Sequence, residues 1–350
     1  MIKKSDFRKT LIFTSILLLS IVMIVVLYFY NIIYANNTNL KKGQNFNLYI
    51  STGSNFGSVI DSLSANKVLI DTAGFIWVAN KKSYITKVKA GRFLIKSSMS
   101  NNEIVNMLRI GAQEPINLTF NNIRTKEELA SAVSKKIELD SIDLINLLND
   151  DDFLKEYHLN KKNVLSMFIP NTYQFYWNTS ADYFLKKMNA EYKMFWTKSR
   201  LEKAKKLKMN LVEISTLASI VQAEQSVHNS EKAKVAGLYI NRLKKGMLLQ
   251  SDPTVVYAIG DFSIRRVLNR DKEIDSPYNT YKYVGLPPAP INLPEISSID
   301  AVLNYEKHNY IFMCAKDDFS GYHYFSTNTT QHNLYARLYQ NALNKRGIKR

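Results

Sequence analysis

The residue best placed to do chemistry is Glu224, the last residue of the segment 210–224. Ile214, Leu217 and Val221 recur at helical spacing, and Glu224 takes the next position on the same face. A carboxylate that continues a buried apolar face is costly to ionise, so its pKa should rise toward the range of a general acid. The alternative is an interfacial Glu whose stem packs while its carboxylate reaches water.

The segments after this helix supply polar side chains that could line a groove. Asp252 precedes Pro253, a strong helix-start signal in which the carboxylate caps the helix, and this structural role is favoured over catalysis. Segments 277–281 and 285–292 are rigid and aromatic-rich, and such loops suit the wall of a groove that binds sugars. Proline-stiffened surface loops would have the same composition.

Hydrophobic periodicity predicts the elements that position these groups. A helix from Ser230 to Gly246 should follow the helix of Glu224. A hairpin over 308–315 and 322–326 carries His323, at a position that is more often structural than catalytic. A closing helix over 328–347 is expected to turn its leucines inward, namely Leu334, Leu338 and Leu343.

The first half of the chain shows the same signals. We expect strands at 46–50, 91–95 and 115–120, and helices at 55–63, 71–79, 100–108, 125–137, 140–148, 152–157 and, as one long amphipathic stretch, 181–208.

The amino-terminal segment predicts a membrane anchor. Leu11 to Tyr34 is 24 residues without a charge, a helix of about 36 Å that can span a bilayer. The basic residues before it should keep the amino terminus in the cytoplasm. A cleaved signal peptide is the alternative, but the apolar run is longer than usual and 34–37 is a poor cleavage site. We therefore expect an uncleaved anchor, with the chain beyond about residue 40 outside the cytoplasmic membrane.

The formal net charge of +17 indicates an anionic partner or simply a basic surface. Anionic lipid headgroups or an anionic wall polymer suit an exported chain, and no aromatic-interleaved nucleic-acid motif is present. Cys314, the single cysteine, is expected in the core and permits no internal disulfide. Metal-ligand spacing is absent, so neither a metal nor an organic cofactor is expected.

Several strings resemble the endolytic murein transglycosylase family, also called the YceG-like family. Leu-Ala-Ser-Ile-Val-Gln-Ala-Glu ends at Glu224, and the order and spacing of five strings agree: 217–224, 235–243, 249–254, 278–281 and 285–288. The segments 170–173 and 321–325 also resemble family motifs.

The resemblance implies an α+β fold with a single transmembrane helix, a LysM-like α/β subdomain and a larger mixed α+β catalytic domain. The expected organisation is a cytoplasmic tail at 1–10, a transmembrane signal anchor at 11–34, a linker at 35–45, the LysM-like subdomain at 46–112 and the lytic transglycosylase domain at 113–350.

The resemblance also assigns roles to residues. Glu224 inherits the role of the family's catalytic acid, and the first Glu of the usual Glu-x-Glu is Gln222 here. Asn171 and Gln331 likewise stand where the family has acids. The residues expected to bind substrate are Gln222, Gln250, Asp252, Thr254, Asn279, Tyr281 and His323.

The implied activity is non-hydrolytic cleavage between N-acetylmuramic acid and N-acetylglucosamine in nascent glycan, which leaves 1,6-anhydro ends and limits strand length. The implied partners are peptidoglycan strands, the membrane, and peptidoglycan synthases with division or elongation proteins. Two alternatives stay open: a hydrolytic muramidase that uses Asp252 to activate water, and a non-catalytic wall-binding scaffold that holds glycan through residues 46–111. A nucleic-acid binder would follow from the charge alone.

Overall fold

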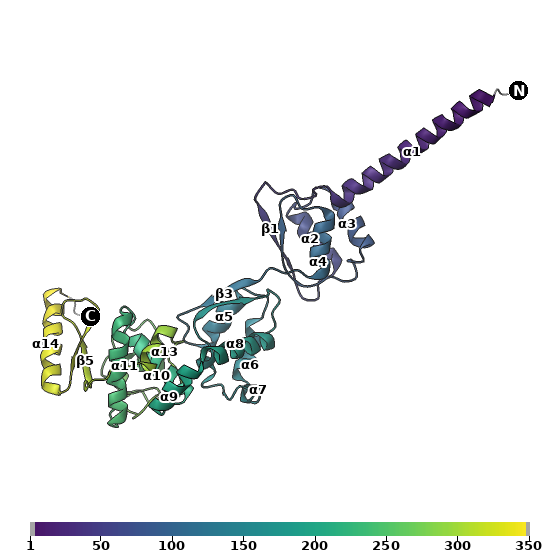
Figure 1. The fold of residues 1–350 in the computed structure, drawn as a ribbon. Helices are drawn as coiled ribbons and strands as arrows, with labels where there is room; N and C mark the ends of the chain where they lie inside the picture. Colours follow the sequence, from purple (N-terminus) through teal and green to yellow (C-terminus); the bar gives the residue numbers. More distant parts are fainter. Residues whose placement is uncertain (1–3, 348–350) are drawn as a thin grey trace. The chain divides into compact units, whose positions relative to one another are not determined.

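The structure, a computed structural model, describes residues 4–347 and is mixed α+β, as predicted (Figure 1). It divides into two compact units. Unit 1 comprises the chain up to Asn117 together with Lys136–Glu138 and Gln174–Thr179, and unit 2 comprises Leu118–Lys135, Leu139–Tyr173 and the chain from Ser180 onward.

Unit 1 is built on a two-stranded antiparallel sheet. Strands β1 (Asn45–Ile50) and β2 (Gly91–Lys96) pair so that Asn45 lies opposite Lys96 and Ile50 opposite Gly91. Alternate side chains of a strand point to one face, and the inward set, which includes Leu48 and Phe93, is fully buried. This face forms the core of unit 1.

Three helices cover that core, namely α2 (Phe56–Ala65), α3 (Thr72–Lys81) and α4 (Asn101–Ile110). Each begins where a polar side chain accepts a hydrogen bond from an otherwise unpaired backbone N–H: Asn55, Asp71 and Ser100 are the three caps. Ser100 and Glu103 form a reciprocal capping box.

Helix α1 (Lys4–Tyr34) is the one helix among residues 4–347 that is long and apolar enough to cross a membrane. Its apolar side chains are exposed over most of its length. Near its end it contacts α3 and α4: Phe29 stacks on Trp77 at 5.0 Å, and Asn101 donates to the Ile32 carbonyl at 2.9 Å.

Unit 2 begins with a helical layer beside a second two-stranded sheet. The elements here are β3 (Ile116–Phe120), α5 (Lys126–Ser134), α6 (Ser141–Asn149), α7 (Asp151–Lys155), the 3-10 turn η1 (Val164–Met167), β4 (Asn171–Phe175), α8 (Ala181–Phe195) and α9 (Lys198–Leu207). The first two residues of β3 and the last two of β4 belong to unit 1. Stretch 181–208, predicted as one helix, is two, because Trp196 ends α8 and Thr197 caps α9 by accepting from the Arg200 N–H.

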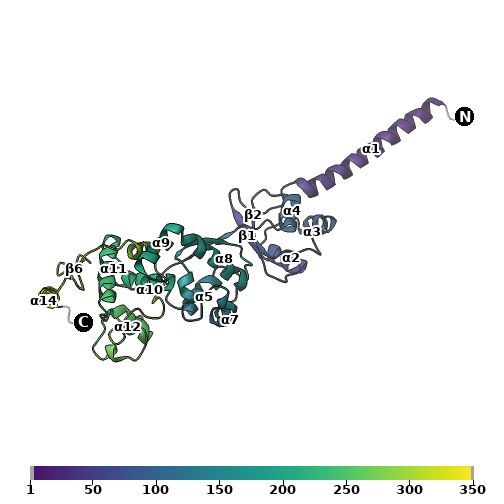
Figure 2. The ribbon, with the colours of Figure 1, turned by 60° about the horizontal axis from the view of Figure 1, so that its bottom comes forward.

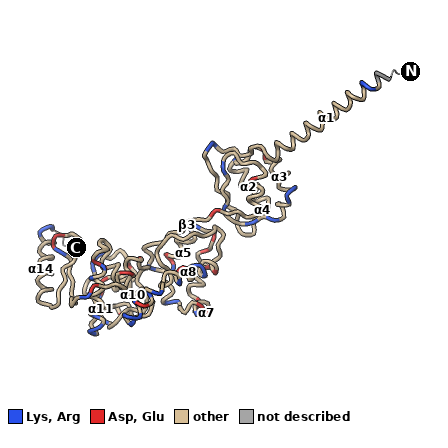
Figure 3. Tube along the Cα trace, in the orientation of Figure 1, with Lys and Arg blue, Asp and Glu red and all other residues tan. Residues whose placement is uncertain are grey.

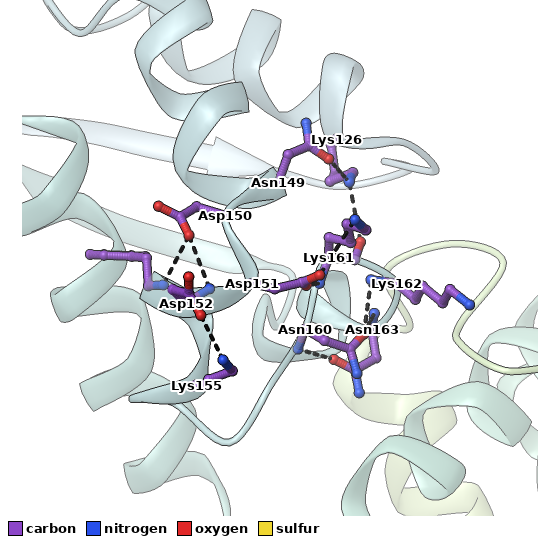
Figure 4. A network of polar contacts seen from close by, with 11 residues as sticks. Lys126, Asn149, Asp150, Asp151, Asp152, Lys155, Asn160, Lys161, Lys162 and Asn163 are labelled. Atoms are coloured by element: carbon purple, nitrogen blue, oxygen red, sulfur yellow. Dashed lines mark hydrogen bonds and ion pairs between the residues drawn. The ribbon is translucent and has the colours of Figure 1, made fainter.

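A polar network ties the turn between α6 and α7 to the loop that follows (Figure 4). Asp150 caps α7 by accepting from the Asp152 and Phe153 N–H groups at 3.0 and 3.1 Å. Asp151 accepts from the Lys161 N–H at 2.7 Å. The bonds to Asp150 satisfy backbone donors that a helix start leaves unpaired, and the bond to Asp151 holds the loop at Lys161 against α7.

The centre of unit 2 is the helix cluster that carries the candidate site (Figure 2). It contains α10 (Leu211–Glu224), α11 (Asn229–Lys244) and α13 (Ile296–Leu303), with α12 (Asp252–Ile259) and the 3-10 turn η2 (Asp271–Glu273) beside it. Buried apolar side chains of α10, α11 and α13 form one continuous core.

The carboxyl-terminal part is a hairpin covered by a helix. Strands β5 (Phe312–Ala315) and β6 (His323–Ser326) pair antiparallel, as predicted, and α14 (Thr329–Lys345) packs on them (Figure 1). The expectation of inward leucines is wrong for Leu334 and Leu338, which are exposed, whereas Leu343 is half-buried. Tyr335 stacks on Tyr324 instead.

Candidate active site

Helix α10 carries Glu224 as its last residue. Asn210 caps the helix by accepting from the Glu213 N–H at 2.9 Å, and Glu213 in turn accepts from the Asn210 N–H at 2.7 Å. The predicted helix is confirmed, and so is its buried face, since Leu217 and Val221 are fully buried. The cap and the core together fix the position at which the carboxyl group emerges.

Two hydroxyl groups hold the Glu224 carboxyl group. Tyr239 of α11 donates to Oε1 at 2.9 Å, and Ser251, just before α12, donates to the same atom at 2.5 Å. Tyr239 and Ser251 are themselves buried. The carboxyl group is therefore fixed by groups from two other segments of the chain.

The surroundings of Glu224 favour its protonated form. Burial raises its pKa above the ordinary value, and the negative charge of Asp252 raises it further. The hydrogen bonds from Ser251 and Tyr239, and the charge of His323, oppose this rise without cancelling it. A raised pKa is the property that the sequence predicted for a general acid.

The Glu224 carboxyl group opens into a cavity of 480 Å³. Four residues predicted to bind substrate line it with Glu224, namely Gln250, Asp252, Tyr281 and His323. A second cavity, of 610 Å³, is lined by Gln222 and again by Asp252. Asp252 thus borders both cavities, and Glu224 and Gln222 face different ones, as their positions on the helix predict.

Asp252 does not cap α12 as predicted. Ser251 occupies the cap position, and no side chain caps the helix there. The Asp252 carboxylate instead accepts a hydrogen bond of 2.5 Å from the Tyr281 hydroxyl. Burial, together with this bond to Asp252, raises the pKa of Tyr281, so that Tyr281 remains a donor.

A buried carboxylate positions His323. Glu231 of α11 accepts from the His323 N–H at 2.9 Å and lies 2.7 Å from His323 Nδ1. Its second partner is the Gln225 amide, which also donates to the Gly321 carbonyl at 3.0 Å. Burial would raise the pKa of Glu231, but the bonds from His323 and Gln225 outweigh it and lower the pKa. Glu231 is therefore ionised and orients the imidazole.

Two of the predicted binding residues are positioned by contacts with the protein. Gln222 is 8 % exposed, and its Oε1 accepts from the Glu295 N–H at 2.6 Å and the Ser298 hydroxyl at 3.1 Å. Gln250 has a left-handed backbone with φ of 54°, and its Oε1 lies 3.3 Å from the Arg242 guanidinium. Gln250 is exposed and can still reach a ligand.

Two others lie inside the protein. Asn279 and Thr254 are fully buried. The Asn279 amide donates to the Lys272 and Ile274 carbonyls at 2.8 and 2.7 Å, and Thr254 donates to the Ser251 carbonyl at 2.7 Å. Their side chains shape the loops around the cavity, and neither lines the two cavities described above.

The sequence did not single out four residues of the site, namely Tyr239, Ser251, Gln225 and Glu231. Tyr239 and Ser251 lie within the family strings 235–243 and 249–254. The resemblance of those two strings to the family was the signal that could have pointed to Tyr239 and Ser251. Glu231 reads locally as an acid in the first turn of a helix, and its partner His323 lies 92 residues away in the sequence.

Nothing in the described part of the chain points to a metal centre. Among residues 4–347, no group of three or more His, Cys, Asp or Glu side chains could hold a metal ion. Cys314, expected in the core, is only half-buried and lines the cavity of Glu224. Carboxyl, hydroxyl and imidazole groups line the cavity with Glu224, namely those of Asp252, Tyr281 and His323.

Replacing Asp252 by Asn should move the pH dependence of cleavage. The charge of Asp252 raises the pKa of Glu224, so its loss lowers that pKa, and Glu224 then gives up its proton at a lower pH. We expect the fall in kcat/KM at high pH to begin at a lower pH than in the wild type. Initial rates of glycan release across pH measure this. Asp261→Asn, at an exposed position outside both cavities, is the matched control, and an unmoved or raised limb in Asp252→Asn would contradict the electrostatic role.

Comparison with known proteins identifies relatives of the whole chain. A protein of Bacillus subtilis (strain 168) named endolytic murein transglycosylase is 29 % identical over 316 residues, which cover 86 % of each chain. A protein of the same name from Streptococcus pneumoniae (strain R6) is 26 % identical over 85 % of this chain, which spans only 60 % of that relative.

A solved structure has a similar fold. The crystal structure of a yceG-like protein from Listeria monocytogenes superposes with a TM-score of 0.57 at 28 % identity, covering 83 % of this chain and 98 % of the other. The family model of the YceG-like family matches residues 48–337. The chain belongs to the YceG-like family.

Proposed function

We propose that the chain is a lytic transglycosylase that cuts murein glycan strands internally and leaves 1,6-anhydro-N-acetylmuramic acid ends. The observation that carries the proposal is the Glu224 carboxyl group, which opens into a cavity while burial raises its pKa. The names of the relatives from Bacillus subtilis and Streptococcus pneumoniae support the substrate.

The geometry suggests which oxygen of Glu224 carries the proton. Both hydroxyl donors, Tyr239 and Ser251, use Oε1, and no hydrogen bond to Oε2 is found among the residues that the structure describes. An oxygen that accepts two hydrogen bonds is poorly placed to hold a proton as well, so the proton resides on Oε2. Oε2 then donates to the bridging oxygen of the glycan.

The reaction needs a single enzyme carboxyl group. As Glu224 protonates the bridging oxygen, the bond to C1 of the muramic residue breaks and positive charge develops on the ring, as in glycoside hydrolysis. The C6 hydroxyl of the same residue attacks C1 and gives its proton to the ionised Glu224. The anhydro ring closes, and Glu224 regains the proton for the next cycle.

A hydrolytic muramidase is the competing function, because Asp252 lines the same cavity and could activate a water molecule. The Tyr281 hydroxyl already binds the Asp252 carboxylate at 2.5 Å, which favours a structural and electrostatic role for Asp252. We therefore assign the attacking oxygen to the substrate.

The masses of the products separate the two functions. Digestion of purified murein should release fragments whose cut ends are one water lighter than reducing ends. Mass spectrometry of the digest measures this directly. Fragments with reducing ends as the main product would establish the hydrolase, and no release of fragments would leave a glycan-binding scaffold.

The wider placement of the enzyme is also proposed. Helix α1 would anchor the chain in the cell membrane with residues 1–10 in the cytoplasm, and residues 113–350 would act as the catalytic domain outside it, beyond a linker at 35–45. We propose that residues 46–112, a two-stranded sheet covered by three helices, form a LysM-like subdomain that binds glycan or acts as a spacer. Cutting near the membrane would limit the length of nascent strands in the vicinity of synthases and of division or elongation proteins.

A further inference from the structure

A cavity of 820 Å³ in unit 1 is lined almost entirely by cations. Its walls are the end of α3, the loop that follows and the end of α4, and they carry Lys81, Lys82, Lys87, Lys89 and Arg109, with Ser83 and Ile110. No Asp or Glu lines it. We call it the basic cavity.

The cations of the basic cavity lack the usual carboxylate partners. Lys82 donates to the Asn102 and Asn106 side chains at 2.6 and 2.9 Å, and Lys89 donates to the Ile110 carbonyl at 2.9 Å. These acceptors are neutral. Among residues 4–347, none of the five cations lies within ion-pair distance of a carboxylate, so their charge is uncompensated by the protein. Figure 3 draws the Lys and Arg positions of the chain in blue and the Asp and Glu positions in red.

Stabilisation of helix ends explains only part of this cluster. Cations in the last turn of a helix offset the negative end of its dipole, and Lys81 and Arg109 occupy such positions in α3 and α4. Lys87 and Lys89 lie outside both helices, in the loop before β2. Ile110, beside them, is 63 % exposed, and an apolar side chain among cations is typical of a surface that meets a lipid interface.

Helix α3 brings this cavity to the outer end of α1. Asp71, just before α3, is bound to Asn37, whose side chain donates to the Asp71 carbonyl at 2.8 Å. Trp77, further along α3, stacks on Phe29, which lies more than one turn before the end of α1 at Tyr34. Helix α3 therefore packs beside the last turns of α1, and Figures 1 and 2 both show it next to the carboxyl-terminal end of α1.

The length of the apolar stretch gives the level of the membrane. A hydrocarbon core of about 30 Å takes about 20 helical residues. A span that starts after Lys9 thus ends near Phe29, which places Trp77 at the interface that tryptophan favours. Lys81, whose ammonium group lies 5.7 Å from the Trp77 ring, then reaches the headgroups.

We propose that the basic cavity binds the phosphate groups of anionic phospholipid headgroups and so holds unit 1 against the outer surface of the membrane. Lysine ammonium groups and the arginine fork are the side chains that bind phosphate. Attraction of a juxtamembrane cation to an anionic leaflet amounts to about fivefold per residue. The proposal rests on the membrane anchoring proposed above and is independent of the glycan chemistry.

The test uses the full chain in nanodiscs of phosphatidylcholine alone or with phosphatidylglycerol. Hydrogen exchange of residues 81–90 and 108–112 should slow by at least about fivefold in the anionic discs, the effect of one cation. The variant K81Q/K87Q/R109Q should lose this protection, because it removes three cations of the basic cavity. Lys82 and Lys89 are left in place, because their internal hydrogen bonds belong to the fold of unit 1. The control K198Q/K205Q/K206Q removes the same charge from α9 and should keep it.

Several results would overturn the proposal. One is equal hydrogen exchange of these residues in the neutral and the anionic discs, and another is an equal loss of protection in the basic-cavity variant and in the α9 control. A third is the same protection in neutral discs when inorganic phosphate or teichoic acid is added at the same phosphate concentration. Unchanged exchange of β1 and β2 shows that the variant is folded. A chain that elutes apart from the discs refutes the anchoring, and glycan cleavage, measured on the same samples, reports separately on the proposed enzyme.

Discussion

Replacing Glu224 by Gln should lower the rate of glycan cleavage by about 10²- to 10⁴-fold, the contribution of positioned proton transfer. The amide keeps an oxygen that can accept from Tyr239 and Ser251, so the site keeps its shape but has no acidic proton to transfer to the glycan. Release of soluble fragments from purified murein, wild type beside variant, measures the effect.

Glu213→Gln is the matched control, because it makes the same change in the first turn of the same helix, where Gln can still complete the capping box. It should cleave at the wild-type rate. Cleavage by Glu224→Gln at the wild-type rate would remove Glu224 from the chemistry.

The stability of the Glu224→Gln variant checks that its fold is intact. Burial raises the pKa of Glu224, so ionising this group costs the folded state free energy. The cost is absent below the ordinary pKa and grows as the pH rises through the raised one. The variant should therefore unfold at the same denaturant concentration as the wild type in acid and at a higher one above the raised pKa.

Replacing Glu231 by Gln should destabilise unit 2 by about 3 kcal/mol, the usual cost of removing one partner from a buried charged network. The new amide nitrogen would face the Gln225 amide or the His323 ring, both of which now point donors at the carboxylate. Glycan cleavage should fall as well, because His323 borders the cavity of Glu224 and loses its orientation. Urea unfolding measures the first effect and fragment release the second.

Glu306→Gln is the control for Glu231→Gln, since Glu306 forms a half-exposed ion pair with Lys234 of the same helix α11, and such pairs contribute about 1 kcal/mol or less. The pKa of Glu231 is lowered, so its stabilisation exists above the ordinary pKa and disappears as the pH falls through the lowered one. The gap between wild type and Glu231→Gln should therefore narrow in acid. Equal stability of the two at neutral pH would show that the network is dispensable.

The sequence predicted most elements because their signals are local. The helix of Glu224 has a capping box and an apolar face that continues to its last turn, and both are in the structure. The start of α12 shows the limit of local signals. Pro253 marks the helix start correctly, but Asp252 binds Tyr281, 29 residues away, and leaves the cap position to Ser251.

The errors share a physical cause, which is packing against distant residues. Helix α14 has one face with Leu334 and Leu338 and another with His332 and Tyr335, and periodicity alone cannot choose between them. Contacts with the hairpin turn the second face inward: Tyr335 stacks on Tyr324 at 4.4 Å, and His332 stacks on Phe312 at 5.1 Å. The roles of Glu231 and of buried Asn279 depend on such partners too.

Digestion of murein in water enriched in oxygen-18 tests the central claim most directly. If the muramic C6 hydroxyl attacks C1 and gives its proton to Glu224, the oxygen at the new end comes from the sugar and not from water. The account predicts anhydro ends that contain no oxygen-18. Reducing ends with one oxygen-18 at C1 would show that water is the nucleophile and would contradict the account.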